Sequence, residues 1–384
     1  MQPSSVYIHI PFCVRKCAYC DFLSFPDCLG QKDLYVDSLC REIRLAPSFF
    51  GKSSVPLRTI YLGGGTPSLL SSEEVQKILA VLSDTFGIAE DCEITLEANP
   101  GTVDGEKLRA FREMGVNRLS IGIQSLSDPV LQVLGRIHNA EGARRTIMAA
   151  QEAGFTNLSS DMMLGIPGQS LQDVEGTLAF FLERNIPHVS LYSLILEEGT
   201  PMYSKYQGDI EKYVSQEEDR AMYHYVVDTL KKAGFLHYEI SNMARPGFES
   251  RHNTMYWRAE PYYAFGLGAH YYLGEERGTH RAGSIDEYIE AFRKNTVTRE
   301  TIYETEEILT EEERRKEFMM LGFRTGDGVD ADRFQERFGI SMESAFAKEL
   351  EREVKTGLVM KEGRRYHLTE KGFDLANQVF EDYV

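Results

Sequence analysis

The first 240 residues alternate between apolar runs of strand length and longer stretches with helical spacing. Val6–Phe12 and Arg58–Leu62 have the length and composition of buried strands. Between them, Leu34, Leu39 and Ile43 are spaced to share one face of a helix over Asp33–Leu45. Strands that alternate with helices predict a parallel sheet, which either lies open or curls into a barrel.

The alternation continues to about residue 240. Further strands are predicted at Glu93–Glu97, Arg118–Gln124, Asn157–Met163, His188–Leu194 and Tyr238–Ile240. Helices are predicted over 72–86, Gly105–Met114, Gly142–Ala153, Leu171–Asn185 and Gln216–Ala233. Gly115, Gly154 and Gly234 each follow a predicted helix, where glycine most easily adopts the left-handed conformation that ends it.

The pattern changes after residue 240. Residues 241–283 are rich in Gly, Tyr and Asn, and helices dominate from Ser284 onward. Two predicted helices over 330–338 and 341–355 precede a hairpin at 358–361 and 366–368, an order typical of a winged helix. We therefore predict three parts: a core over 1–240, a connecting segment over 241–283, and a helical C-terminal domain over 284–384.

Composition narrows the class of protein. The chain has 384 residues, 42% of them hydrophobic, which is enough for a large core. Its formal net charge of −17 argues against nucleic-acid binding, so we expect the winged-helix-like part to be a structural cover. No run of about 18 apolar residues and no signal peptide is evident, which predicts a cytoplasmic protein with no membrane span.

Three cysteines directly follow the first predicted strand. Cys13, Cys17 and Cys20 lie close enough together for their thiols to converge on one metal centre. Clustered thiols in a reducing compartment more often bind metal than form disulfides. Iron–sulfur clusters usually have four Cys ligands, so three would leave one iron free for another ligand. A structural zinc site made by the three thiols and His9 is the alternative. Cys28, Cys40 and Cys92 receive no role.

The C-x3-C-x2-C spacing resembles the radical S-adenosylmethionine (SAM) superfamily. The flanking residues Tyr7-Ile-His-Ile-Pro-Phe-Cys13 and Cys17-Ala-Tyr-Cys20-Asp-Phe are similar to the branch that holds oxygen-independent coproporphyrinogen III oxidase and the HemW-type heme chaperones. The resemblance implies a [4Fe–4S] cluster on Cys13, Cys17 and Cys20, with SAM on the open iron. It also implies a partial six-stranded (β/α) barrel, open on one side.

A set of polar residues lies at or near the C-terminal ends of the predicted strands, where α/β barrels build their sites. It includes the glycine-rich turn Gly63-Gly64-Gly65-Thr66, where a backbone without side chains can approach a ligand closely. Position by position, the resemblance implies SAM contacts for Tyr7, Tyr19, Gly64, Gly65, Thr66, Glu97, Gln124, Arg136 and Asp161. Arg136 could pair bidentately with the SAM carboxylate, and Glu97 could bind the ammonium group or a ribose hydroxyl.

Two local features bear on function within the branch. Phe22 stands where the oxidase has a fourth cysteine, which argues against decarboxylase activity. The stretch His252-Asn-Thr-Met-Tyr-Trp257 is similar to the HNxxYW motif of the heme chaperones, with His252 as candidate iron ligand and His270 and His280 as competitors.

The resemblance thus implies a heme chaperone that binds a cluster, SAM and heme. Its expected partners are an electron donor for the cluster and heme-accepting target proteins. Three further hypotheses stay open at this point: a coproporphyrinogen III oxidase, a heme-degrading radical SAM methyltransferase, and a zinc protein without a redox role.

Overall fold

A nine-stranded sheet forms the centre of the structure, a computed structural model that describes residues 2–294 and 296–384. Six strands run parallel and lie side by side in chain order. They are β1 (Ser5–Ile10), β2 (Leu57–Gly64), β3 (Ile88–Ala98), β4 (Arg118–Gln124), β5 (Asn157–Leu164) and β6 (His188–Ser193). The predicted parallel βα core is confirmed, with strand ends that differ by a few residues.

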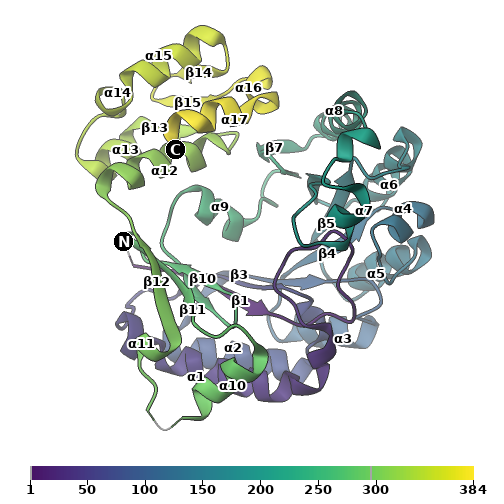
Figure 1. Cartoon of the computed structure of the whole chain (residues 1–384), viewed down its shortest axis with the longest axis vertical. Coiled ribbons are helices and arrows are strands. Elements are labelled where there is room, and N and C mark those ends of the chain that lie inside the picture. The colour runs from purple at the N-terminus through teal and green to yellow at the C-terminus, as the bar shows by residue number, and fades with distance from the viewer. Residues whose placement is uncertain (1, 295) are drawn as a thin grey trace.

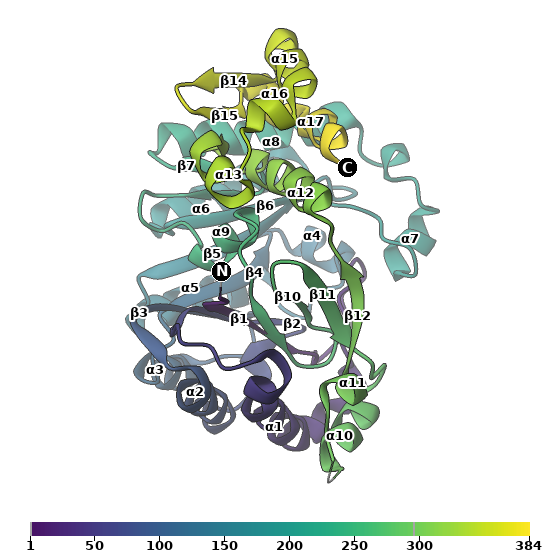
Figure 2. The same cartoon turned by 90° about the vertical axis from the view of Figure 1, so that its left-hand side faces the viewer.

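Helices connect these strands and lie outside the sheet, as Figures 1 and 2 show. They are α1 (Lys32–Phe50), α2 (Ser72–Phe86), α3 (Gly105–Glu113), α4 (Asp128–Val133), α5 (Ala140–Glu152), α6 (Leu171–Glu183), α7 (Pro201–Tyr206) and α8 (Gln216–Lys232). Gly115, Gly154 and Gly234 have φ angles of 103°, 90° and 85°, so the predicted helix stops are confirmed. Apolar side chains from helices and strands form one core around the sheet.

Both edges of the parallel sheet are extended by short strands. At β6 the chain adds β8 (Asn242–Ala244) and β7 (Leu236–Glu239) in antiparallel pairing. At β1 it adds β9 (Tyr263–Phe265), which runs parallel to β1. The sequence did not predict β8 or β9, because three residues are too few for a period to show.

The His252–Trp257 stretch forms a helix, α9 (Arg251–Trp257), where no helix was predicted. The Ser250 hydroxyl accepts a hydrogen bond from the Asn253 N–H at 3.2 Å and so caps its N-terminus. Figures 1 and 2 both show α9 between the central sheet and the C-terminal domain.

A second, three-stranded sheet packs beside α1. It consists of β10 (His270–Tyr272), β11 (Glu276–His280) and β12 (Tyr303–Ile308), with α10 (Ile285–Arg293) and α11 (Arg299–Ile302) between the last two. Glu42 of α1 is fully buried, and it accepts hydrogen bonds from the hydroxyls of Tyr288 and Tyr303 and from the backbone N–H of Gly266. The carboxylate therefore joins α1 to this sheet.

The C-terminal part has an apolar core of its own, from Phe318 to Tyr383. Its elements are α12 (Glu311–Phe323), β13 (Val329–Asp330), α13 (Ala331–Phe338), α14 (Met342–Ala345), α15 (Ala347–Thr356), β14 (Val359–Glu362), β15 (Arg365–Leu368), α16 (Glu370–Asp374) and α17 (Ala376–Phe380). The predicted hairpin is present, and β13 adds a third strand to it. The domain boundaries at 240 and 283 stay predictions.

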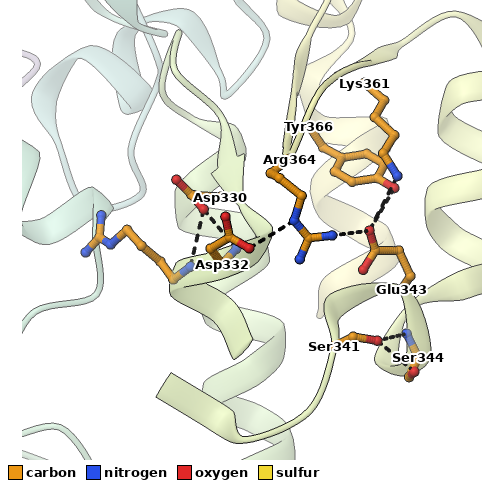
Figure 3. Close-up of polar contacts among 9 residues, drawn as sticks. Asp330, Asp332, Ser341, Glu343, Ser344, Lys361, Arg364 and Tyr366 are labelled. Atoms are coloured by element: carbon orange, nitrogen blue, oxygen red, sulfur yellow. Dashed lines mark hydrogen bonds and ion pairs between the residues drawn. The ribbon is translucent and has the colours of Figure 1, made fainter. Parts of the chain in front are cut away.

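Ion pairs fasten this hairpin to the helices, as Figure 3 shows. Arg364, in the turn of the hairpin, lies 2.9 Å from Asp332 of α13 and 3.7 Å from Glu343 of α14. Lys361 lies 3.4 Å from the same Glu343. Within the described residues, no helix is both long enough and apolar enough to span a bilayer.

Candidate functional site

A cavity of about 390 Å³ lies at the C-terminal ends of the parallel strands. Eleven of the thirteen predicted site residues line it: Cys13, Cys17, Tyr19, Cys20, Gly64, Gly65, Thr66, Glu97, Gln124, Arg136 and Asp161. They come from the loop after β1 and from β2 to β5 or the segments that follow them. The structure therefore brings together residues spread over about 150 positions, and we call this space the thiol cavity.

The three cysteines are free, partly exposed thiols on the loop after β1. The Cys13 thiol lies 3.5 Å from the Thr66 hydroxyl, and the Arg136 guanidinium donates to the Cys17 sulfur at 3.4 Å. The backbone N–H of Ala18 donates to the Leu134 carbonyl at 3.1 Å. The loop is thus held against the turn after β2 and the segment after α4.

Among residues 2–294 and 296–384, no three His, Cys, Asp or Glu side chains converge closely enough to hold one metal ion. His9, the fourth ligand of the alternative zinc site, hydrogen-bonds elsewhere. Its Nδ1 is 3.1 Å from the Tyr7 hydroxyl, and its Nε2 donates to the Leu23 carbonyl at 3.0 Å. In a cubane cluster each thiolate binds a different iron. The three thiols must therefore be neighbours, but they need not converge on a single metal ion.

The glycine turn packs directly against the cysteine loop. The N–H of Gly65 donates to the Ile10 carbonyl at 2.9 Å, and that of Gly64 donates to Glu97 at 3.1 Å. Gly64 has a φ angle of 107°, in the region that favours glycine. A Cβ atom on Gly65 would lie 2.6 Å from the Phe12 carbonyl oxygen, closer than real atoms approach. Only glycine fits between the loop and this turn.

We therefore expect Gly65→Ala to push the cysteine loop away from the turn. The free energy of unfolding should fall by about 1–3 kcal/mol, which is typical of overpacking. The yield of reconstituted cluster should fall as well. Gly30→Ala is the matched control, because no atom lies within 4 Å of its added Cβ. Thermal unfolding and iron analysis measure both effects, and equal values for the two variants would contradict the expectation.

Two partly buried carboxylates face the thiol cavity. Glu97 accepts hydrogen bonds from the Tyr61 hydroxyl at 2.7 Å and from the Gly64 N–H, yet burial raises its pKa to about 7. Burial also raises the pKa of Asp161, opposed by hydrogen bonds from Ser190 and Ser120. A ligand with a cationic group or with hydroxyls would therefore pair favourably with these two acids.

Several buried polar atoms around the cavity lack a hydrogen-bond partner among the described residues. They are Gln124 Oε1, Arg136 Nε and Arg118 Nε. Buried polar groups are normally paired, so such atoms mark places where a polar ligand or water binds. Gln124 also has a φ angle of 66°, an uncommon conformation for a residue other than glycine and one that concentrates at functional sites.

These features fit SAM, which carries an ammonium, a carboxylate, ribose hydroxyls and an adenine. The volume of the thiol cavity lies within the range of about 300–1,000 Å³ that is usual for cofactor sites. Arg136 is a cation that can pair with the carboxylate, and Glu97 and Asp161 are carboxyl groups that can pair with the ammonium or the hydroxyls. Residues and chemistry therefore agree with the cofactors that the sequence pattern implied.

Arg118 is the main site residue that sequence reasoning missed. It is the first residue of β4 and lines the thiol cavity, although only 2% of its surface is exposed. Its charge lowers the pKa of both Glu97 and Asp161. The sequence feature that could have identified Arg118 is its charge at the start of a strand whose other residues indicate burial on both faces.

Tyr7 and His252 do not line the thiol cavity. The Tyr7 ring stacks on Tyr61 at 6.1 Å between centroids, so it lies behind the cavity wall. The His252 ring is 1% exposed, with Nδ1 2.8 Å from the Thr59 hydroxyl and Nε2 2.9 Å from the Tyr256 hydroxyl. Burial lowers its pKa to about 3, so the ring is neutral. Heme ligation by His252 stays a prediction, and it would require the ring to leave at least one of these hydrogen bonds.

The competing histidines differ in accessibility. His280 is buried and its Nε2 lies 2.7 Å from Glu42, where it forms part of the network that joins α1 to the small sheet. His270 is exposed on β10, and its Nδ1 lies 2.8 Å from Glu306. His280 is therefore accounted for by packing, and His270 by a surface hydrogen bond with Glu306.

Comparison with known proteins identifies the family to which the chain belongs. The model of the radical SAM superfamily matches residues 7–181, and that of the HemN C-terminal domain matches residues 309–375. The heme chaperone HemW of Lactococcus lactis is 36% identical over 383 residues, covering 100% of this chain and 98% of its own. HemW of Bacillus subtilis is 37% identical over 382 residues, covering 99% of each chain. The solved coproporphyrinogen III oxidase of Escherichia coli has a TM-score of 0.83 and 21% identity, covering 100% of this chain and 90% of its own.

The parallel βα core and the three-thiol loop thus define a radical SAM protein with a C-terminal domain of the HemN type. Within that superfamily, the chain belongs to the HemW family. The structural likeness to the oxidase, at 21% identity, concerns the fold alone.

Proposed function

We propose that this protein is a cytoplasmic heme chaperone that holds a [4Fe–4S] cluster, binds SAM and passes heme to target proteins. The observation that carries the proposal is the similarity, over essentially the whole chain, to relatives named heme chaperone HemW. Phe22 adds support, because the position of the oxidase's fourth cysteine carries no thiol here, and its side chain is 65% exposed.

Every predicted residue except His252 has a role in the cluster and SAM sites of this proposal. Cys13, Cys17 and Cys20 would ligate three irons of the cluster, and the fourth iron would be open to SAM. The cluster, when bound, supplies an electron for reductive cleavage of SAM, and a separate protein supplies that electron to the cluster. Arg136 binds the SAM carboxylate, Glu97 the ammonium, and Asp161 and Gln124 the ribose or the adenine. Gly64, Gly65 and Thr66 hold the methionine part, Tyr19 lies near the adenine, and Tyr7 supports the wall through Tyr61.

The test uses protein whose cluster has been rebuilt anaerobically. Ferric heme is titrated into it, transfer to an apo-heme protein is followed by the Soret band, and conversion of coproporphyrinogen is assayed in the same sample with SAM and reductant. Stoichiometric heme binding and transfer without conversion are expected. Conversion without specific heme binding would mean that the protein is the oxidase.

A heme-degrading enzyme and a structural zinc protein would each give a different result in the same sample. Loss of the Soret band in the presence of SAM and reductant would indicate heme degradation. Zinc without iron and sulfide would indicate a structural metal site. Either result would overturn the chaperone proposal.

A further inference from the structure

One residue of the α9 helix reaches the thiol cavity. Asn253 is half-buried and lines that cavity together with Tyr61 and Arg118. Its backbone N–H donates to the Ser250 hydroxyl at 3.2 Å, but its carboxamide makes no hydrogen bond with any of residues 2–294 and 296–384. A carboxamide both donates and accepts hydrogen bonds, so it offers an unused polar group to a ligand in the cavity. None of the predicted SAM contacts lies on α9.

The first turn of α9 is fastened to the parallel core. The buried carboxylate of Glu93, in β3, accepts hydrogen bonds from the backbone N–H groups of Arg251 at 3.1 Å and of His252 at 3.0 Å. A carboxylate at this place pairs with N–H groups that the helix itself leaves free, and it complements the positive end of the helix dipole. The His252 ring adds its stacking contact with Tyr61. The core therefore holds α9 at one end.

The last turn of α9 is fastened to the C-terminal domain. The guanidinium of Arg337, in α13, donates to the carbonyls of Arg258 at 3.3 Å and of Ala259 at 2.8 Å. Cations are favourable there because they pair with carbonyls that the helix leaves free. The guanidinium of Arg324, directly after α12, lies over the Trp257 ring, 4.3 Å from its centroid. Two arginines of the C-terminal domain therefore hold the other end of α9.

Between these attachments, α9 borders open space. A cavity of about 840 Å³ separates the start of β1 and β2 from the C-terminal domain, and Thr254 and Trp257 line it. Figures 1 and 2 show α9 at this junction. Protein interiors are normally close-packed, so a helix beside a space of this size can shift without displacing its neighbours. A helix of seven residues is only about 10 Å long, so a shift of its last turn also moves Asn253.

We propose that Asn253 is a further contact for SAM in the thiol cavity, and that Arg324 and Arg337 position it through α9. The C-terminal domain then forms part of the SAM site, although none of its described residues lines the thiol cavity. The linkage is reciprocal, so an attachment that favours SAM binding is itself strengthened when SAM binds. This inference rests on the SAM binding that the proposed function includes, and it gives roles to Asn253 and Trp257 of the HNxxYW stretch.

The contact is tested by anaerobic equilibrium binding of SAM to the cluster-loaded, full-length protein. Asn253→Ala should weaken binding by about threefold to tenfold, the usual effect of losing a neutral hydrogen bond. Asn377→Ala, which alters an exposed asparagine of α17, is the matched control and should bind SAM like the wild type. Unchanged affinity in Asn253→Ala would overturn the contact.

The positioning role is tested with a double-mutant cycle. Arg337→Gln should weaken SAM binding by about threefold to tenfold, because it frees the last turn of α9. In the Asn253→Ala background it should cause no further loss, since the group that it positions is gone. Arg337→Lys keeps a cation that can donate to the carbonyls and should recover part of the affinity. No loss in the single variant, or losses that multiply in the double variant, would overturn the positioning role.

Trp257 provides a second measurement because it is the only tryptophan of the chain. Its fluorescence therefore reports on the junction of α9 with the C-terminal domain. Bound SAM should shift the emission of the wild type, and saturating SAM should shift that of Asn253→Ala much less. Arg352→Gln, which alters an exposed arginine of α15, should respond like the wild type. A wild-type emission that does not change when SAM binds would overturn the coupling.

The outcomes separate this inference from the proposed function. A wild type that binds no SAM would overturn both. SAM binding that neither Asn253→Ala nor Arg337→Gln weakens would overturn the inference and leave the proposed function standing.

Discussion

Arg136→Ala is expected to weaken SAM binding by about a hundredfold. The Arg136 guanidinium is half-buried in the thiol cavity, where it donates to Asn99 and to the Gly122 carbonyl, the latter at 2.7 Å. It is also the cation we assign to the SAM carboxylate. Truncation removes that partner and leaves Asn99 Oδ1 and the Gly122 oxygen unpaired, and losing one partner of a buried charged pair costs about 2–5 kcal/mol.

The measurement is anaerobic equilibrium binding of SAM to the cluster-loaded protein. Arg136→Lys is the informative second variant, because it keeps the charge but loses the planar, bidentate geometry. It should fall between the wild type and Arg136→Ala. Arg145→Gln, which alters an exposed arginine, should bind SAM like the wild type. Equal affinities for Arg136→Ala and the wild type would remove Arg136 from the SAM site.

Periodicity was enough to predict the parallel core because each of its strands spans six residues or more and each is followed by a helix, most of them long. It failed in the segment after residue 240. There, β8 and β9 have three residues each, and α9 has seven, too few to show a hydrophobic face. These short elements form because residues distant in sequence pair with them, as Tyr263 does with Val6.

The thiol cavity was predictable because its residues belong to motifs, above all the cysteine loop and the glycine turn. Arg118 belongs to none of the motifs recognised, so only its position in space reveals it. His252 shows the converse: its motif was recognised, but its partner Thr59 lies 193 residues away in the chain. That contact helps to bury the ring and to hold it away from the thiol cavity.

The α9 helix borders the thiol cavity through Asn253. The neighbouring His252 ring stacks on Tyr61 at 5.1 Å, and the Tyr61 hydroxyl donates to Glu97. A continuous series of contacts therefore leads from α9 to an acid of the proposed SAM site, which makes the protonation of Glu97 worth measuring.

SAM affinity is expected to fall as the pH drops below about 7. Burial raises the pKa of Glu97 to about 7, so below that pH the free protein holds a neutral carboxylic acid. The SAM ammonium requires the carboxylate, so binding must then release a proton and should weaken by up to about tenfold per pH unit. Above pH 7 the group is already ionised and the affinity should level off. Binding measured from pH 6 to 8 tests this.

Two substitutions test the assignment of this profile to Glu97. Glu97→Gln should weaken binding at pH 8 by about a hundredfold and make it nearly independent of pH, because the charged partner is gone. The Tyr61 hydroxyl stabilises the carboxylate, so Tyr61→Phe should raise the pKa of Glu97 and start the fall in affinity at higher pH. Glu90→Gln, on the exposed end of the same strand, should behave like the wild type. A flat profile in the wild type would mean that Glu97 meets a ribose hydroxyl, because a hydroxyl can hydrogen-bond to either protonation state of the acid.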